Sequence, residues 1–417
     1  MTIPSVLSIA QHSRLASRQL SSASETTRNL ALTNMARVLE SVKTQVLAVN
    51  AQEVAKARDE GQAEAMVKRL TIDDKTFQYM LSRLQKVAQL PDPLNRILTG
   101  HTNPNGLRVY KKSVPLGVIG IIYESRPNVT TDAAGVCIKS GNAVILRGGS
   151  EALLTNTLLT DAMVEGAVSA GLPQHALQII RIPGHEAVGE LLAMDEYIDV
   201  LIPRGGKGLI KRIAEGTRIP VIKHYDGICH LYLAADADPA QAVAIAINSK
   251  CQSVQVCNAL ETLLVDQQCA EQLLPLLQSA FAARNTELRG CARTQKIVPT
   301  VLAATEDDWH SEYLAPILAV KIVDGIDAAI DHINHYGSGH TDAIVTQSLA
   351  MAQQFEQQVD SASVLINAST RLSGGGDYGL GSVVGISTDK LHVRGPVGPN
   401  ELTSYKWVAY GDGHLRG

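Results

Sequence analysis

The chain has 417 residues and a formal net charge of −4, from 37 Lys and Arg against 41 Asp and Glu. It is therefore long enough for two or three domains, and too close to neutral to favour a nucleic-acid or membrane surface. No uninterrupted apolar run reaches about 18 residues, which excludes a transmembrane helix, and the six cysteines show no CxxC pair or zinc-ligand spacing. These features predict a cytoplasmic protein with reduced thiols and a small-molecule substrate.

The first 24 residues contain Arg14, Arg18 and many serines but no acid, a composition that weakly resembles an organelle transit peptide. Apolar residues recur at roughly helical spacing from Val6 to Leu20, so we favour an amphipathic first helix. Residues 25–89 are rich in Ala, Leu, Arg and Glu and contain no proline, which predicts a helical segment.

Turn residues interrupt this pattern between Pro91 and Gly106. Residues 108–113 then alternate in character and carry charge, like an exposed hairpin arm. The apolar run PLGVIGIIYES at 115–125 is typical of a buried parallel strand.

Strands and helices alternate over the rest of the chain. Strands are predicted at 143–149, 176–184 and 198–206, with helices between them, and a second set begins near Leu231. This alternation predicts doubly wound α/β domains, whose ligands bind at the carboxyl ends of the strands.

Three glycine-bearing turns follow successive predicted strands and precede helices. Glycine lets the backbone approach a pyrophosphate, and the N–H groups of the next helix supply partial positive charge. The GxGxxG spacing is absent, so plain turn chemistry is the alternative. Nearby Arg and Lys favour the 2′-phosphate of NADPH, with surface ion pairs as the alternative. The candidate cofactor-binding residues of these turns are Arg147, Gly148, Gly149, Ser150, Gly184, Arg204, Gly205, Gly206 and Lys207.

The string SKCQSVQVCNALETLLV at 249–265 places Cys257 in a polar loop directly ahead of an apolar strand. Most cysteines are small buried hydrophobes, which is the structural alternative. A thiol at such a junction is a candidate nucleophile. Its own backbone N–H and a nearby amide side chain suit the oxyanion of acyl transfer, and Asn258 follows directly.

Other cysteines and histidines favour structural roles. His332, His335 and His340 have no acid or cysteine at ligand spacing, so we interpret them as a helix end and a turn and predict no metal. Cys251 is expected to be a spectator and Cys137 part of the core.

The order of these motifs resembles the aldehyde dehydrogenase superfamily over roughly residues 110–390. The chain is similar in detail to the γ-glutamyl phosphate reductase family, in the strings IYESRPNVT, GNAVILRGG, IDVLIPRGG, DGICHLYL, CNALETLLV, VLINASTRL, GLGSVVGIST, LHVRGPVG and LTSYKW. This implies an aldehyde dehydrogenase-like α/β fold with two doubly wound domains and an oligomerisation arm. We expect an NADPH-binding domain at 1–233 with the arm near 107–114, a catalytic cysteine domain at 234–385, and a tail at 386–417 that contributes to a homo-oligomer.

The resemblance also implies site residues. Cys257 corresponds to the catalytic cysteine, Glu312 in SEYLAPI to the glutamate that contacts the nicotinamide ribose, and Arg147 to the lysine near the adenine ribose. Asn128 is the candidate for the oxyanion-binding asparagine, although an ungapped count falls on Glu124.

One departure from the superfamily concerns mechanism. Oxidising members have a glutamate in an ELGGK motif that activates water, and this chain has IKHYDGICH there, with His224 near the place of that glutamate. The loss of a hydrolytic base fits an enzyme whose thioester receives a hydride.

The implied reaction is the NADPH-dependent reduction of L-glutamyl 5-phosphate to L-glutamate 5-semialdehyde with release of phosphate, the second step of proline biosynthesis from glutamate. A Cys257 thioester would divide it into two easier steps. Arg126 and Arg371 are candidates for the substrate's anionic groups, with Asn367 a further candidate and a loop-capping role the alternative for Arg371. A separate glutamate 5-kinase is the expected partner. An oxidising aldehyde dehydrogenase and a non-catalytic scaffold remain alternatives.

Overall fold

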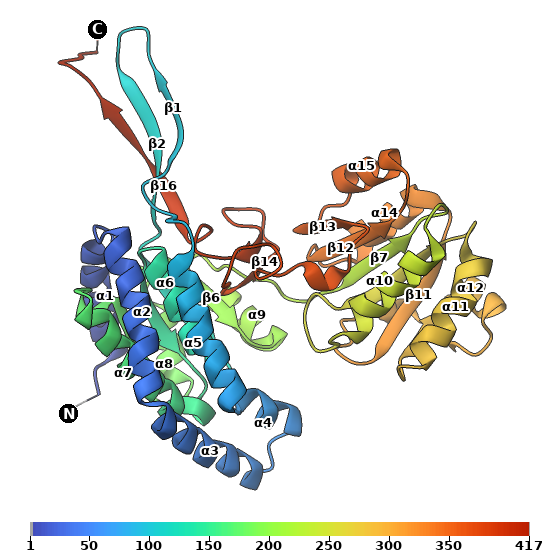
Figure 1. The fold of residues 1–417 in the computed structure, drawn as a ribbon, viewed down its shortest axis with the longest axis horizontal. Helices are drawn as coiled ribbons and strands as arrows, with labels where there is room; N and C mark the ends of the chain where they lie inside the picture. The colour runs from blue at the N-terminus through green and yellow to red at the C-terminus, as the bar shows by residue number, and fades with distance from the viewer. Residues whose placement is uncertain (1–2, 417) are drawn as a thin grey trace. The chain divides into compact units, whose positions relative to one another are not determined.

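The computed structural model describes residues 3–416, and the chain divides into two units (Figure 1). Unit 1 comprises Met1–Lys223, Gly379–Ile386 and Val397–Gly417, and unit 2 comprises His224–Tyr378 and Ser387–Pro396. This division differs from the expected boundary at residue 233 and from an undivided tail. None of the helices within residues 3–416 combines the length and apolar character that a membrane crossing requires.

Unit 1 contains a helical N-terminal half followed by alternating strands and helices. Its elements are α1 (Val6–Leu20), α2 (Glu25–Ser41), α3 (Lys43–Asp59), α4 (Glu64–Leu70), α5 (Asp74–Gln89), β1 (Ile97–Thr102), β2 (Arg108–Pro115), β3 (Val118–Tyr123), α6 (Asn128–Lys139), β4 (Ala143–Arg147), η1 (Ser150–Ala152), α7 (Leu153–Ser169), η2 (Gln174–Ala176), β5 (Leu177–Ile179), α8 (Glu186–Leu192), β6 (Val200–Arg204), α9 (Lys207–Gly216) and β16 (Thr403–Tyr410). Short strands β14 (Gly385–Ser387) and β15 (Gly395–Val397) pair with each other, and unit boundaries fall within both.

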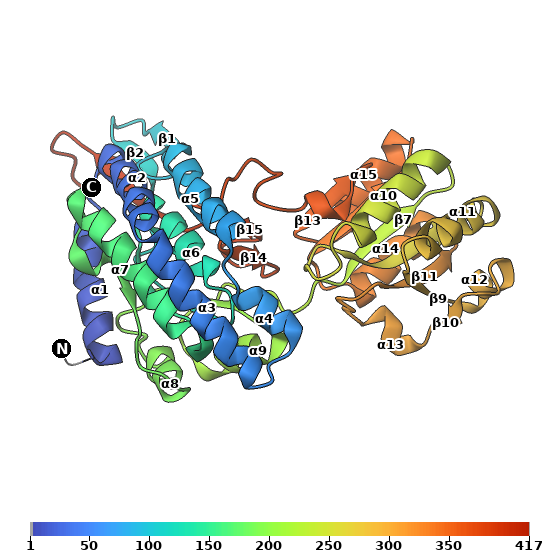
Figure 2. The ribbon, with the colours of Figure 1, turned by 60° about the horizontal axis from the view of Figure 1, so that its bottom comes forward.

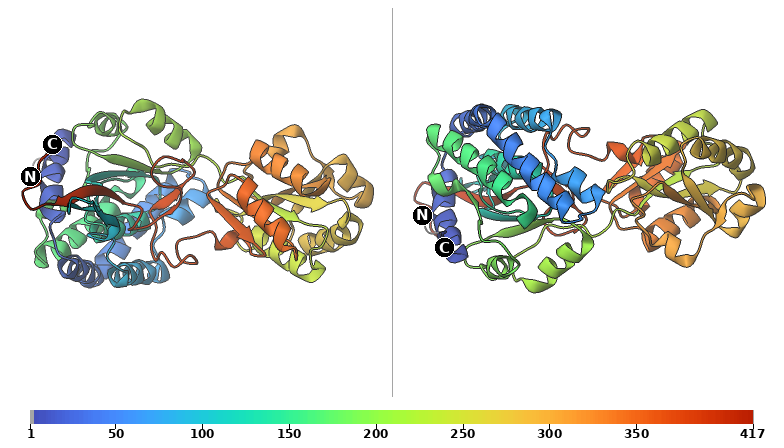
Figure 3. Two further views of the ribbon diagram at one scale, coloured as in Figure 1. Left: turned by 90° about the horizontal axis from the view of Figure 1, so that it is seen from above. Right: turned by 90° about the horizontal axis from the view of Figure 1, so that it is seen from below.

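A four-stranded parallel sheet in the order β5-β4-β3-β6 forms the centre of unit 1. Its strands are apolar and buried because helices cover both faces, as parallel sheets require. α1 and α8 supply core side chains on one face, while α6 and α7 pack with α2 and α5 on the other (Figures 2 and 3). Gly166 of α7 permits this packing, since a β-carbon there would lie 2.5 Å from the Met35 backbone nitrogen of α2.

Strands β1, β2 and β16 form an antiparallel arm that extends from unit 1 (Figure 1). The sequence predicted the arm near residues 107–114, and the family resemblance implied that the C-terminal tail completes it. β1 lies in the stretch assigned to turns, and the chain's last strand pairs along β2, with Trp407 opposite Lys111. The C-terminal segment therefore completes the arm.

Unit 2 is a second α/β layer structure around a seven-stranded sheet in the order β10-β9-β11-β8-β7-β12-β13, whose pairs are parallel. Its elements are β7 (Cys229–Leu233), α10 (Pro239–Cys251), β8 (Leu260–Asp266), α11 (Ala270–Ala282), β9 (Glu287–Gly290), α12 (Ala292–Ile297), β10 (Leu302–Ala303), α13 (Glu306–Trp309), β11 (Ile317–Val323), α14 (Gly325–Tyr336), β12 (Thr341–Val345), α15 (Leu349–Gln358), β13 (Ser363–Ile366) and η3 (Thr370–Leu372).

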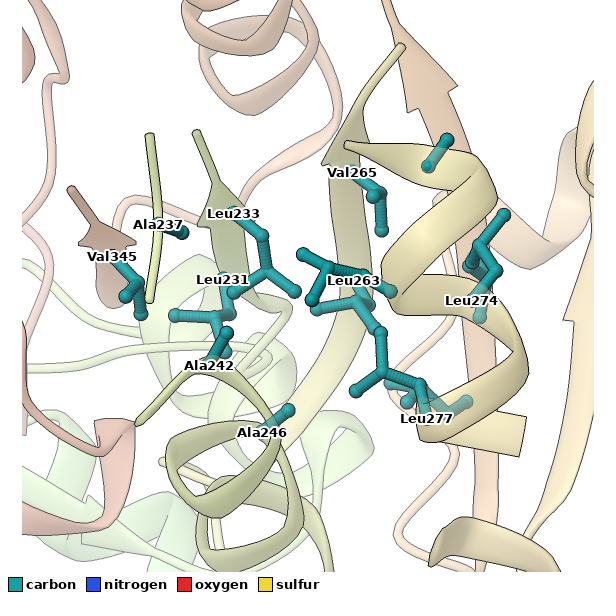
Figure 4. Close-up of a cluster of buried hydrophobic side chains, with 14 of the residues drawn as sticks. Leu231, Leu233, Ala237, Ala242, Ala246, Leu263, Val265, Leu274, Leu277 and Val345 are labelled. Atoms are coloured by element: carbon teal, nitrogen blue, oxygen red, sulfur yellow. The ribbon is translucent and has the colours of Figure 1, made fainter. Parts of the chain in front are cut away.

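Apolar side chains of the central strands of unit 2 pack against α10 and α11 (Figure 4). Leu231 and Leu263 face Ala242 and Leu277 in this cluster, all of them buried. On the other face of the sheet, side chains of β7, β8 and β12 pack with those of α14 and α15. The buried sheet fixes the strand ends that carry the candidate site.

Candidate active site

Residues at the amino ends of three neighbouring strands in unit 2 form the candidate active site. Cys257 lies in the loop ahead of β8, Cys229 begins β7, and His340 directly precedes β12. The order β8-β7-β12 makes these strands adjacent. The sulfur of Cys257 and one ring nitrogen from each of His224 and His340 all lie within 4.8 Å of one another. The thiol that the sequence selected as nucleophile therefore stands in an imidazole-rich environment.

The segment after His224 packs directly against the Cys257 loop. The S–H of Cys229 donates to the Cys257 carbonyl oxygen at 3.2 Å, and the N–H of Gly227 donates to Glu312 Oε1 at 3.0 Å. Glu312, predicted to contact a nicotinamide ribose, thus lies beside this segment within unit 2. Its ribose contact stays a prediction.

Arg371 lies close enough to Cys257 for an electrostatic interaction with its thiolate. Burial lowers the pKa of the Arg371 guanidinium, while the negative charges of Cys257 and Asp377 raise it. Its Nε donates to Gln252 at 2.9 Å. A fixed positive charge near a thiol favours the thiolate, and the same charge can bind an anionic substrate group.

Asn258 holds the Arg371 loop in place. Its amide nitrogen donates to the carbonyl oxygens of Arg371 and Ser373, at 3.3 and 3.0 Å. This amide nitrogen is thus engaged with the backbone. Asn367, predicted as a substrate residue, is similarly engaged, because its amide accepts from the N–H of Thr346 and donates to the carbonyl of Thr346, both at 2.9 Å.

A buried ion pair lies at the base of the Cys257 loop. Lys250, near the end of α10, contacts Glu261 of β8 at 2.5 Å, and both side chains are fully buried. Burial raises the pKa of Glu261 to about 7 and lowers that of Lys250. The pair joins the two elements between which Cys257 is held.

The glycine turns of unit 1 separate into two kinds. A β-carbon on Gly184 or Gly206 would meet nothing within 4 Å, although the N–H of Gly206 donates to Glu124 Oε2 at 2.9 Å. Gly148, Gly149 and Gly205 are instead packed, with a β-carbon lying within 2.5 Å of Asn156, Glu151 and Glu124 respectively. Open turns at strand ends fit a nucleotide that approaches the backbone closely. Ser150 begins η1 and Lys207 begins α9, both beside these turns.

Arg147 bridges two of the turns. Its guanidinium is buried and donates to the carbonyl of Gly148 and to that of Gly184, the latter at 2.7 Å. Burial lowers its pKa, against the attraction of Glu151. Arg147 was predicted at these turns, and its two hydrogen bonds join the Gly148 turn to the Gly184 turn.

A pocket of about 240 Å³ lies within unit 1. It gathers Arg126, Asn128 and Arg204 with two residues that the sequence interpretation missed, Arg69 and Asp132. The Asn128 amide lies 3.5 Å from Asp132 Oδ2, and burial raises the pKa of Asp132 against the nearby charge of Arg83. Guanidinium groups beside one carboxyl group suit a small ligand with several charges.

The sequence did not predict that His340 lies near Cys257, and we interpreted it with His332 and His335 as a helix end and a turn. A local signal was present, since His340, Cys229 and Cys257 each stand at or just before the start of a buried strand. Their proximity follows only from the order of those strands.

Comparisons with known proteins agree with this architecture. The aldehyde dehydrogenase family matches residues 3–289 and 285–379. A γ-glutamyl phosphate reductase from Thermotoga maritima is 39% identical, with a TM-score of 0.97 over 99% of this chain and 100% of that chain. A γ-glutamyl phosphate reductase from Saccharomyces cerevisiae is 30% identical, with a TM-score of 0.56 over 100% of both chains. An acetylating aldehyde dehydrogenase from Geobacillus thermoglucosidasius shares the fold at 19% identity, with a TM-score of 0.68 over 99% of this chain and 97% of that one. The chain therefore belongs to the aldehyde dehydrogenase family and, within it, to the group that contains the γ-glutamyl phosphate reductases.

Proposed function

We propose that this enzyme reduces L-glutamyl 5-phosphate to L-glutamate 5-semialdehyde, with release of phosphate, and so carries out the second step of proline biosynthesis from glutamate. The observation that carries this proposal is the setting of Cys257. The segment where oxidising relatives have their deacylating glutamate brings His224 to the thiol instead. The Cys257 sulfur would attack the acyl carbon, phosphate would leave with its electron pair, and a thioester would form.

The cofactor in this proposal is NADPH, which supplies the hydride that reduces the thioester when it is bound. Members of the aldehyde dehydrogenase family use nicotinamide nucleotides. The open turn at Gly184 supports binding of the pyrophosphate, and Lys207 at the start of α9 adds a positive charge. At Gly206 the pyrophosphate would replace the Glu124 carboxylate that now accepts from the backbone N–H. Glu312 would bind the nicotinamide ribose, and Arg147 would hold the turns.

Substrate binding requires cations for a phosphate and a carboxylate. Arg126, in the unit 1 pocket, and Arg371, beside Cys257, would each bind an anionic group. Asn128 would donate to the oxyanion. Asn367 would support the Arg371 segment through its bonds to Thr346.

The proposal extends to partners. The arm exposes aromatic side chains, with Trp407 60% and Tyr405 50% accessible, and such a surface suits a contact between copies of the chain. We therefore propose a cytoplasmic homo-oligomer built through the arm. A glutamate 5-kinase would supply the labile acyl phosphate.

The reverse reaction tests the activity, because it avoids the labile acyl phosphate and the semialdehyde can be added in equilibrium with its cyclic imine, pyrroline-5-carboxylate. Purified enzyme is given glutamate 5-semialdehyde and NADP⁺, with and without phosphate, beside a Cys257→Ala variant. We expect NADPH formation that requires phosphate and is lost in the variant. Equal sustained rates without phosphate would identify an oxidising aldehyde dehydrogenase instead.

A further inference from the structure

His340 is a fully buried side chain with an unsatisfied nitrogen next to the nucleophile. Its exposure is 0%, and its Nε2 has no hydrogen-bond partner among residues 3–416. A buried acceptor without a hydrogen-bond partner destabilises the folded protein. The buried side chains of His230 and His332 also have an unpartnered Nε2, but His340 is the one of these three with a ring nitrogen grouped within 4.8 Å of the Cys257 sulfur.

The hydrogen bonds on the other side of the ring determine which nitrogen carries the proton. Nδ1 lies 2.8 Å from the hydroxyl oxygen of Thr341 and 3.8 Å from the sulfur of Cys229. Thr341 donates its own hydrogen to Ser373 at 2.8 Å, and Cys229 donates its hydrogen to the Cys257 carbonyl. Both neighbours therefore present lone pairs to Nδ1, which must be the protonated nitrogen. Nε2 is left with a lone pair.

We propose that His340 is the general base that takes the thiol proton of Cys257 onto Nε2. As the sulfur–carbon bond forms, the S–H bond breaks and its proton moves to Nε2, while the leaving group departs with its electron pair. When the carbon–sulfur bond later breaks, the departing thiolate regains that proton. The acyl phosphate as leaving group rests on the proposed function, but the proton transfer applies to any electrophile that Cys257 attacks.

The His340 ring is neutral at rest. Burial, with the nearby His224, lowers the pKa of His340 to about 3, so the resting side chain is neutral and its lone pair is available. A preformed thiolate–imidazolium pair is disfavoured in this site. The Cys257 sulfur and a ring nitrogen of His340 lie within 4.8 Å of each other, which can be longer than a hydrogen-bond distance. Catalytic hydrogen bonds often shorten only when the substrate binds.

Alkylation of Cys257 by iodoacetamide tests the base without substrate or cofactor. The full chain is treated with EDTA present, since thiols and imidazoles bind traces of Zn²⁺, and modification of the Cys257 peptide is followed by mass spectrometry. His340→Asn keeps a donor toward Thr341 and removes the base. We expect its alkylation to be slower by about 10²-fold. In D₂O the wild-type reaction should slow, and the variant should lose this isotope effect, which a purely structural role would leave unchanged.

His332→Asn is the matched control, because His332 is also buried in unit 2 with an unpartnered Nε2. Its alkylation rate should equal that of the wild type.

Alkylation of a folded His340→Asn variant at a rate within two-fold of the wild-type rate overturns the proposal. So does slowing confined to His224→Asn, which would make His224 the base. Should His340→Asn not fold, His340→Gln replaces it with the same expected loss. Phosphate dependence of the wild-type reaction reports on the proposed function separately.

Discussion

Gly227 packs directly against the backbone of Cys257. A β-carbon at position 227 would lie 1.9 Å from the Cys257 carbonyl oxygen and 2.8 Å from its Cα. Because both partners are backbone, no side-chain rotation can relieve this contact. The residue at 227 therefore sets where the nucleophile stands.

The Gly227→Ala variant should displace the Cys257 loop. We expect kcat/KM to fall by about 10²-fold or more, since misplacement of about 1 Å costs that much. Steady-state kinetics of the reverse reaction measures the loss. Gly189→Ala is the control, because a β-carbon there meets nothing within 4 Å. Wild-type kinetics in Gly227→Ala would show that the loop position does not matter.

Breaking the Lys250–Glu261 pair should destabilise unit 2. Lys250→Met leaves the Glu261 carboxylate buried without its partner, and we expect the free energy of unfolding to fall by about 3–5 kcal/mol. The double variant Lys250→Met, Glu261→Leu removes both charges and should lose less. Urea unfolding of the three proteins provides the comparison. A single variant as stable as the double one would contradict a coupled pair.

Acid should destabilise unit 2 through its buried histidines. Burial lowers the pKa of His332 to about 2 and that of His340 to about 3, while an unfolded histidine titrates near 6.5. Between about pH 3 and 6.5 the unfolded state binds protons that the folded state does not, so stability falls as pH falls. Each histidine contributes a slope of about 1.4 kcal/mol per pH unit.

The His332→Asn variant isolates one of these contributions. Its free energy of unfolding, measured at several pH values from 4 to 7, should change less steeply than that of the wild type. Parallel curves for the two proteins would show that His332 titrates alike in the folded and unfolded states.

Self-association should depend on the arm. Trp407→Asp places a charge on an exposed aromatic surface of β16, and we expect the proposed homo-oligomer to dissociate toward single chains. Light scattering after size-exclusion chromatography measures the molar mass. Leu349→Asp is the control, since Leu349 is 72% exposed but belongs to α15 in unit 2. An unchanged mass in Trp407→Asp would exclude this surface from the interface.

The sequence predicted most elements with a buried face. The apolar run at 115–125 contains β3, and the predicted strand at 143–149 contains β4. Both could be predicted because a parallel strand buried on both faces consists almost entirely of apolar residues. The fold class and the family are confirmed by the comparisons. β1 escaped prediction because every one of its residues is exposed. β1 is held by its pairing with β2, and the sequence of β1 alone contains no pattern that predicts this pairing.

The candidate site could be predicted only in part for the same reason. Cys257 was identifiable from its loop-to-strand position, a local property. Its neighbours His224 and His340 lie far from it in sequence and from each other, and they meet because β8, β7 and β12 are adjacent. The hydrogen bonds of Arg147 to the carbonyls of Gly148 and Gly184 could not be predicted either, because they depend on the conformation of its side chain. Roles assigned to the other site residues stay predictions.

The most direct test of the central claim is the amount of NADPH formed per enzyme when glutamate 5-semialdehyde and NADP⁺ are mixed without phosphate. A Cys257 thioester that only phosphate can discharge predicts a burst of one NADPH per chain that then stops. The mass of the Cys257 peptide should increase by the glutamyl group, and added phosphate should restart turnover. Continuous NADPH formation without phosphate, or a burst that survives in Cys257→Ala, would contradict the account.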